Sequence, residues 1–172
     1  MEAENSLNLM IWNISLIIVW NICVFLACIH GKKKFFDSSK RMYRIKSWEK
    51  DGKFYSHKLK IKKWKDFLPQ YVSKGGFSKK SLESTSIDYI DRFILETCRG
   101  EWAHRMCLLI SVPIYFFNKI NVGIGLVLTI FCVQLPFIFI QRYNRIRLQK
   151  LKERLQKDGK ERKFILNKVA KC

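Results

Sequence analysis

Residues 7–29 read LNLMIWNISLIIVWNICVFLACI, an apolar run without one charged side chain. A helix needs about 20 such residues to cross the hydrocarbon core of a bilayer, so this run predicts a membrane span. Two acidic residues precede the run, and three lysines follow it at residues 32–34. A cleaved signal peptide carries positive charge before its apolar run, so we expect a retained helix over residues 1–31.

Two further apolar runs lie close together after the middle of the chain. They cover residues 105–117 and 122–140, and a polar turn at 118–121 separates them. This arrangement predicts a helical hairpin whose first limb must include residues before 105 to be long enough to cross. The predicted fold class is therefore an all-α integral membrane protein with about three transmembrane helices, one N-terminal span plus a hairpin, and a basic cytoplasmic segment.

The positive charges of the chain are placed unevenly. The formal net charge is +19, and of the 33 Lys and Arg residues 20 lie between residues 32 and 105 and 12 lie after residue 141. The remaining one, Lys119, lies in the turn of the hairpin. Because cytoplasmic loops carry the excess of Lys and Arg, we expect a multi-pass protein with its N-terminus outside and its C-terminus in the cytoplasm.

These patterns divide the chain into four regions. An N-terminal transmembrane helix covers 1–31, a basic aromatic cytoplasmic segment covers 32–84, an amphipathic helix continuing into the hairpin covers 85–141, and a basic cytoplasmic helix covers 142–172. The basic aromatic segment has three candidate partners: the anionic lipid surface, which we favour, nucleic acid, and a phosphorylated co-substrate such as acyl-CoA. The six cysteines form no CxxC pair, so neither a disulfide framework nor a zinc site is predicted.

The amphipathic helix should carry two ionisable residues on its apolar face. At 3.6 residues per turn, Glu101 and His104 continue a stripe that begins with isoleucines. A charged group on such a face near the membrane is costly unless it is paired, and it marks function by default. The stripe and the residues of the opposite face are Ile87, Ile90, Ile94, Thr97, Glu101, His104 and Leu108 against Asp88, Arg92, Glu96 and Arg99.

Glu101 and His104 are three residues apart, so their side chains can meet on one helix face. A carboxylate bonded to one imidazole nitrogen makes the other a better base toward a hydroxyl, as acyl transfer requires. The alternative is a buried Glu–His bond that only holds the bundle together. Glu-x-x-His also occurs in di-iron bundles, but those need a second copy, which this sequence lacks, so no metal site is predicted.

The last apolar run has unusual polar residues of its own. Gln134, Gln141 and Arg145 fall on one helical arc, with Asn144 beside them. Buried amides need partners, and a hairpin would let this arc face the Glu101–His104 stripe. The two arginines of the string QRYNR (141–145) could hold a carboxylate or a phosphate. The alternative is an interfacial belt of Arg and Tyr.

Two strings on these helices resemble one known family. ETCRGEWAH (96–104) and QRYNRIR (141–147), with FNK (117–119) between them, are similar to the glycosyl-diaponeurosporenoate acyltransferase family of staphyloxanthin-type carotenoid synthesis. DGKFY (51–55) and IKKWK (61–65) add weaker matches upstream. The resemblance covers most of the chain between about residues 45 and 155, and both specific strings coincide with the polar residues singled out above.

The resemblance implies a bacterial cytoplasmic-membrane enzyme that transfers a fatty acyl group from an activated donor to a sugar hydroxyl of a glycosylated isoprenoid or another lipid-linked acceptor. It implies no bound cofactor, with acyl-CoA or another activated donor as co-substrate, and a homo-oligomer could complete the site. The alternatives are another membrane-embedded lipid-modifying or hydrolytic enzyme, and a non-catalytic small subunit of a larger complex. His104 becomes the candidate base and Glu101 its orienter, while the residues expected to order the site or bind substrate are Glu96, Thr97, Arg99, Gln134, Gln141, Arg142, Tyr143, Asn144 and Arg145.

Overall fold

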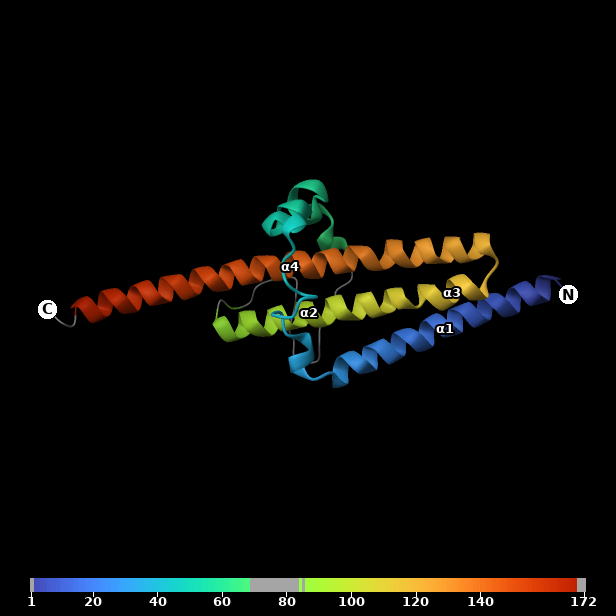
Figure 1. Cartoon of the computed structure of the whole chain (residues 1–172), viewed down its shortest axis with the longest axis horizontal. Coiled ribbons are helices and arrows are strands. Elements are labelled where there is room, and N and C mark those ends of the chain that lie inside the picture. Colours follow the sequence, from blue (N-terminus) through green and yellow to red (C-terminus); the bar gives the residue numbers. More distant parts are fainter. Residues whose placement is uncertain (1, 69–83, 85, 170–172) are drawn as a thin grey trace. The chain divides into compact units, whose positions relative to one another are not determined.

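The computed structural model describes residues 2–68, 84 and 86–169 and is helical, without a strand in that part of the chain (Figure 1). The all-α fold class is therefore confirmed. Four α-helices carry the architecture, and five short 3₁₀ or π helices connect the first to the second. Their bounds are α1 Glu2–His30, η1 Lys33–Phe36, η2 Ser47–Gly52, η3 Phe54–Lys58, η4 Ile61–Lys63, η5 Lys65–Phe67, α2 Ile87–Leu109, α3 Ser111–Phe117 and α4 Ile120–Val169.

Helices α1 and α4 are long and apolar enough to cross a membrane, over Leu7–His30 and within Ile120–Gly159. Their large apolar side chains are exposed, as Ile18 at 53% and Leu128 at 59% illustrate. Such contiguous apolar surface is rare on a water-soluble protein and suits contact with lipid. The chain is therefore a membrane protein, and among the described helices α1 and α4 meet the length and hydropathy requirement.

The second of the three expected spans is divided between two helices. Helix α2 passes through Gly100 without a break, and it ends at Leu109. Pro113 has no amide hydrogen for the carbonyl of Leu109 and clashes with it, which explains the break before α3. The Ser111 hydroxyl bonds to the Leu108 carbonyl at 2.6 Å and satisfies an acceptor beside the break.

The chain divides into two compact units. The membrane unit comprises Met1–Asp37 and Arg99–Gln141, and the basic unit comprises Ser38–Cys98 and Arg142–Cys172. The boundaries fall inside α2 and α4, so both helices contribute to each unit. In particular, the third expected span and the basic C-terminal helix are one continuous helix, α4.

Polar side chains fasten α1 to its neighbours inside the membrane unit. The amides of Asn13 and Asn118 bond reciprocally, at 2.8 and 3.0 Å. Farther along α1, the indole of Trp20 donates to the Met106 carbonyl at 2.8 Å. Because apolar side chains gain little from leaving lipid for a helix interface, such polar bonds contribute to the association of membrane helices.

The basic unit has a folded core. Figure 1 shows the short helices η2 to η5 lying against α4, and in this unit Tyr43, Tyr55 and Ile61 are fully buried. The expected basic aromatic segment is thus more than a lysine-rich surface strip, at least over its described residues up to 68. A second cluster joins α2 to α4 through Ile90, Phe93, Ile94 and Leu148.

Candidate active site

The side chain of a serine caps the start of α2. The Ser86 hydroxyl accepts a hydrogen bond from the backbone N–H of Tyr89 at 3.3 Å, so Ser86 is the N-cap. Most of the predicted inward stripe is present, because Ile90, Thr97 and Glu101 are fully buried, whereas Ile87 at its start is 40% exposed. Helix α2 therefore delivers its polar residues to a buried face, as the periodicity predicts.

His104 lies in the membrane unit, where two side chains of α4 contact its ring. Its Nδ1 lies 2.8 Å from Oε1 of Gln134, and its ring stacks on that of Phe137 with centroids 4.7 Å apart and planes inclined by 10°. The expectation that Gln134 faces the polar stripe of α2 across the hairpin is met by this contact. The residue as a whole is half-buried.

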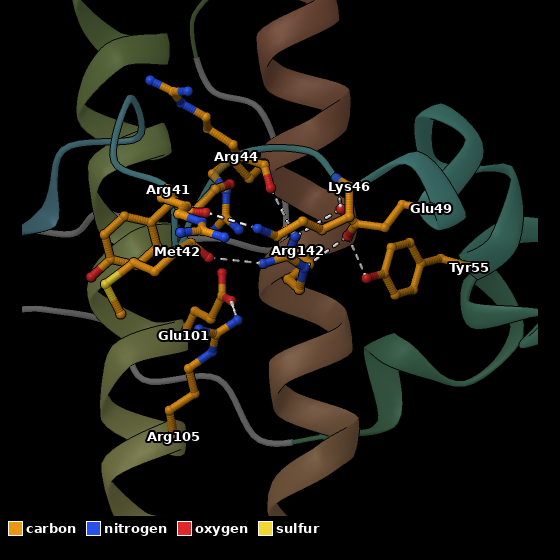
Figure 2. Close-up of polar contacts among 11 residues, drawn as sticks. Arg41, Met42, Arg44, Lys46, Glu49, Tyr55, Glu101, Arg105 and Arg142 are labelled. Atoms are coloured by element: carbon orange, nitrogen blue, oxygen red, sulfur yellow. Dashed lines mark hydrogen bonds and ion pairs between the residues drawn. The ribbon is translucent and has the colours of Figure 1, made fainter.

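Glu101 forms an ion pair with Arg105, one turn further along α2. The Oε1–Nη2 distance is 2.5 Å, and the glutamate side chain is fully buried while the arginine side chain is 33% exposed (Figure 2). This pairing lowers the cost of a buried carboxylate in a membrane helix. Glu101 was expected to orient His104. Its described ion pair is with Arg105, and the described hydrogen bond of the His104 Nδ1 is to Gln134.

Gly100 lets α4 approach α2 closely beside this pair. A Cβ at position 100 would lie 2.9 Å from Cδ and Nε2 of Gln141, closer than real Cβ contacts. The Gln141 side chain therefore occupies the space that the missing side chain leaves. Within the described part of the chain, the buried Oε1 of Gln141 accepts no hydrogen bond.

Arg99 lies against one ring of an aromatic cluster in the membrane unit. Its guanidinium lies over the Phe36 ring, 5.1 Å from the centroid, and Trp102 makes edge-to-face contacts with Phe35 and Phe36. A guanidinium held on an aromatic face keeps its charge while it is oriented. Arg99 is thus a positioned cation in the same unit as His104.

The basic unit holds a buried ion pair that the sequence did not point to. The Glu49 carboxylate receives Nε and Nη2 of Arg142 at 2.7 Å each, and the Tyr55 hydroxyl at 2.6 Å (Figure 2). The backbone N–H of Lys46 also donates a hydrogen bond to this carboxylate. Arg142 also donates to the carbonyls of Met42 at 3.3 Å and Arg44 at 3.1 Å.

Arg142 was expected to bind substrate, and its described contacts are with groups of the basic unit. A guanidinium has five N–H donors, and the bonds to Glu49, Met42 and Arg44 use four of them. The side chain is also 5% exposed. These bonds fasten the segment between residues 42 and 49 to α4.

Burial and bonding act in opposite directions on Glu49. Burial raises the pKa of the carboxyl, but the bonds from Arg142, Tyr55 and Lys46 outweigh it and hold the pKa below its usual 4.5. Burial and the bond to Glu49 raise the pKa of Tyr55 above its usual 10.0. The cluster therefore consists of an ionised Glu49, an ionised Arg142 and a neutral Tyr55 at neutral pH.

The other expected substrate-binding residues lie in the basic unit, and three of them have described contacts. The Thr97 hydroxyl donates to the Ile94 carbonyl of its own helix at 2.6 Å, which keeps it in the helix interface. Arg145 is 1% exposed, donates to the Tyr43 carbonyl at 3.1 Å and lies over the Tyr43 ring. Tyr143 is 3% exposed and lies 6.4 Å from the Tyr55 ring, while Glu96 and Asn144 are half-buried.

Four residues with clear roles were not singled out from the sequence: Arg105, Phe137, Glu49 and Tyr55. Arg105 and Phe137 lie one turn from Glu101 and Gln134, so helical spacing could have found them. Glu49 is an acidic residue in a lysine-rich stretch, and that contrast was a usable signal. Among the described residues, no three His, Cys, Asp or Glu side chains gather as a metal site.

Comparisons with known proteins agree on one family. A model of the glycosyl-4,4'-diaponeurosporenoate acyltransferase family matches residues 39–154, which begin after α1. A glycosyl-4,4'-diaponeurosporenoate acyltransferase of Staphylococcus aureus strain MRSA252 is 29% identical over 135 residues, 73% of this chain and 77% of the relative. Its counterpart in strain RF122 / ET3-1 is 28% identical over the same shares. No solved structure matches the chain. The chain therefore belongs to the glycosyl-4,4'-diaponeurosporenoate acyltransferase family, a family of acyltransferases.

Proposed function

We propose that this protein transfers a fatty acyl group from an activated donor to a sugar hydroxyl of a glycosylated isoprenoid acid. The acceptor follows from the relatives, whose name specifies a glycosyl-4,4'-diaponeurosporenoate. The single observation that carries the chemistry is the half-buried His104, held at 2.8 Å by Gln134 on the facing helix. A positioned imidazole is the commonest general base for a hydroxyl nucleophile.

The reaction forms one bond and breaks one bond. The sugar oxygen attacks the acyl carbon and forms an ester, while the bond from that carbon to the leaving group breaks. The hydroxyl proton passes to the His104 imidazole and from there to the leaving group, so the base is regenerated. With a thioester donor such as acyl-CoA, the leaving group departs as a thiol.

The charged groups of the membrane unit suit the other requirements of this step. The tetrahedral intermediate carries a negative charge, and cations fixed in a medium of low polarity stabilise such charge strongly. Arg99, held against Phe36, and Arg105, paired with Glu101, are two such cations on the helix that carries His104. We assign them to donor binding and to stabilisation of the intermediate.

We also propose a placement in the cell membrane with the N-terminus outside and the basic unit in the cytoplasm. Support comes from the charges flanking the spans, because the end of α1 is followed by three lysines and the polar part of α4 is rich in Lys and Arg. An activated acyl donor of the cytoplasm would then meet the acceptor at the inner leaflet. A second copy of the chain could complete the lipid-binding surface.

The direct test is reconstitution. Purified protein in bilayers is supplied with an acyl-CoA and a glycosylated carotenoid acid, and products are separated by mass spectrometry. We expect an acylated glycoside, with loss of product in His104→Ala and retention in His57→Ala, a matched change at an exposed histidine. Release of free fatty acid without acylated glycoside would instead indicate a hydrolase.

A further inference from the structure

The basic unit contains an open pocket that the proposed reaction does not use. Its volume is about 430 Å³, and it is lined by α2, by α4 and by the segment 38–45. The lining positions on α4 are 149, 152, 153 and 156, which recur every three to four residues and so share one face of that helix. A pocket of this volume can hold a small ligand, and its lining side chains indicate the chemistry of that ligand.

The charged side chains that line the pocket balance each other. Two of them are cations, Arg44 and Lys152, and two are carboxylates, Asp91 and Glu153. Such a balance is unexpected in a chain whose formal net charge is +19. The two carboxylates repel a phosphate or another anion, and the two cations repel a free cation. The pocket therefore suits a neutral polar ligand.

The two cations offer hydrogen-bond donors to such a ligand. Nε of Arg44 donates to the Ser39 carbonyl at 2.7 Å, which orients the guanidinium and leaves its other N–H groups for a ligand. Nζ of Lys152 donates to Oδ1 of Asp91 at 2.5 Å, and the ammonium group has further hydrogens to donate. The pocket therefore has donors whose side chains are already held in place.

The pocket also has acceptors. Within the described part of the chain, the buried Oε1 of Gln149 accepts no hydrogen bond. A buried acceptor without a partner is costly, and a ligand hydroxyl in the pocket would supply the missing hydrogen after a rotation of the amide. The carboxylates of Asp91 and Glu153 are further acceptors on the pocket wall.

We propose that this pocket binds a glycosyl group, to which the two cations donate hydrogen bonds and from which Gln149 and Glu153 accept them. A hydroxyl both donates and accepts, so a ring with several hydroxyls matches a wall of mixed donors and acceptors. The C–H faces of a sugar are apolar, and Ile45 and Ile94 give the pocket apolar surface. The inference goes beyond the proposed function, because binding within the basic unit requires neither an acyl donor nor His104.

The test measures binding of methyl β-glucoside to the full-length protein in nanodiscs by saturation-transfer NMR, with empty nanodiscs as the blank. The ring protons of the glucoside should receive saturation from the native protein. Gln149→Leu and Glu153→Leu should each raise the Kd about tenfold, because each removes one acceptor. Asp158→Leu changes an exposed carboxylate of α4 outside the pocket and should leave the Kd unchanged.

Three results would overturn the inference: no saturation of the glucoside by the native protein, an equal Kd in all variants, or displacement of the glucoside by an equal concentration of inorganic phosphate. Binding that is lost in His104→Ala and kept in Glu153→Leu would also overturn it, since the sugar would then occupy the candidate active site. A glucosyl-diacylglycerol added to the nanodisc distinguishes the sources of the ligand. Competition would support a lipid headgroup, and its absence beside intact glucoside binding would support a soluble sugar.

Discussion

The two units use different polar chemistry to hold their helices. In the membrane unit, side-chain amides take part in several bonds between helices, as in Asn13 with Asn118 and Gln134 with His104. In the basic unit, a buried ion pair between Glu49 and Arg142 joins the short helices to α4. The charged pair of the membrane unit, Glu101 with Arg105, lies within one helix, and amides supply directed bonds between helices without adding charge. In the basic unit a buried charge pair joins different elements, because carbonyls, a hydroxyl and a backbone N–H surround it.

Arg142→Met should produce the largest effect, by leaving the Glu49 carboxylate buried without its counter-charge. Removing one partner of a buried pair costs about 3–5 kcal/mol. Thermal unfolding in detergent, followed by near-ultraviolet circular dichroism, measures this loss. The double variant Glu49→Met, Arg142→Met should recover much of it, and a double variant as unstable as the single one would contradict the ion-pair account.

The pH dependence of the basic unit should be governed by the same cluster. The pKa of Glu49 is lowered on folding, so its contribution is present above pH 4.5 and is lost as the pH falls through the lower folded value. The pKa of Tyr55 is raised on folding, so the hydroxyl loses its proton first in the unfolded state. The free energy of unfolding therefore falls as the pH rises above 10.0. Unfolding midpoints across this range should decline at both ends, and Glu49→Gln should flatten the acid side.

Asn118→Leu should cost less, because it removes neutral bonds from the membrane unit. Polar contacts between membrane helices are worth about 0.6–2 kcal/mol. Equilibrium unfolding of Asn13→Leu, Asn118→Leu and the double variant gives the coupling energy of the pair. Asn8→Leu, at an exposed position of α1, is the control. Strictly additive losses would show that the amide pair does not act as a unit.

Gly100→Ala should have the smallest effect on stability and a larger one on turnover. The new Cβ meets the flexible end of Gln141, which can move aside, and alanine favours the helix by about 1 kcal/mol. Gly125→Ala is a matched control in α4, since nothing lies within 4 Å of its added Cβ. Unfolding and acyl transfer are measured on both variants. Native turnover in Gly100→Ala would place Gln141 outside the site.

Helical periodicity was sufficient for much of α2 and for its contact with α4. The buried stripe of α2 and the approach of Gln134 to His104 follow from 3.6 residues per turn and a hairpin. The break at Ile110 could also have been read from Pro113. These features are local, so the sequence around each residue contains the information needed.

The contacts between residues far apart in the chain could not be predicted from the sequence. Glu49 and Arg142 are 93 residues apart, and Asn13 and Asn118 are 105 apart, with no spacing rule to join them. Helical spacing allows Glu101 to pair with Arg105, four residues on. It equally allows a bond to His104, three residues on, so the sequence alone does not decide between them. A single sequence shows which residues share a helix face, whereas their partners depend on how helices pack.

Lipid mass spectrometry of cells tests the central claim, that His104 is the base of an acyl transfer, most directly. Cells producing native protein, His104→Ala or His57→Ala at equal membrane levels are compared. The account predicts that a glycosylated isoprenoid loses one acyl chain in His104→Ala and keeps it in His57→Ala. An acylated glycolipid pool that is unchanged in His104→Ala would contradict the claim and leave His104 as a packing residue.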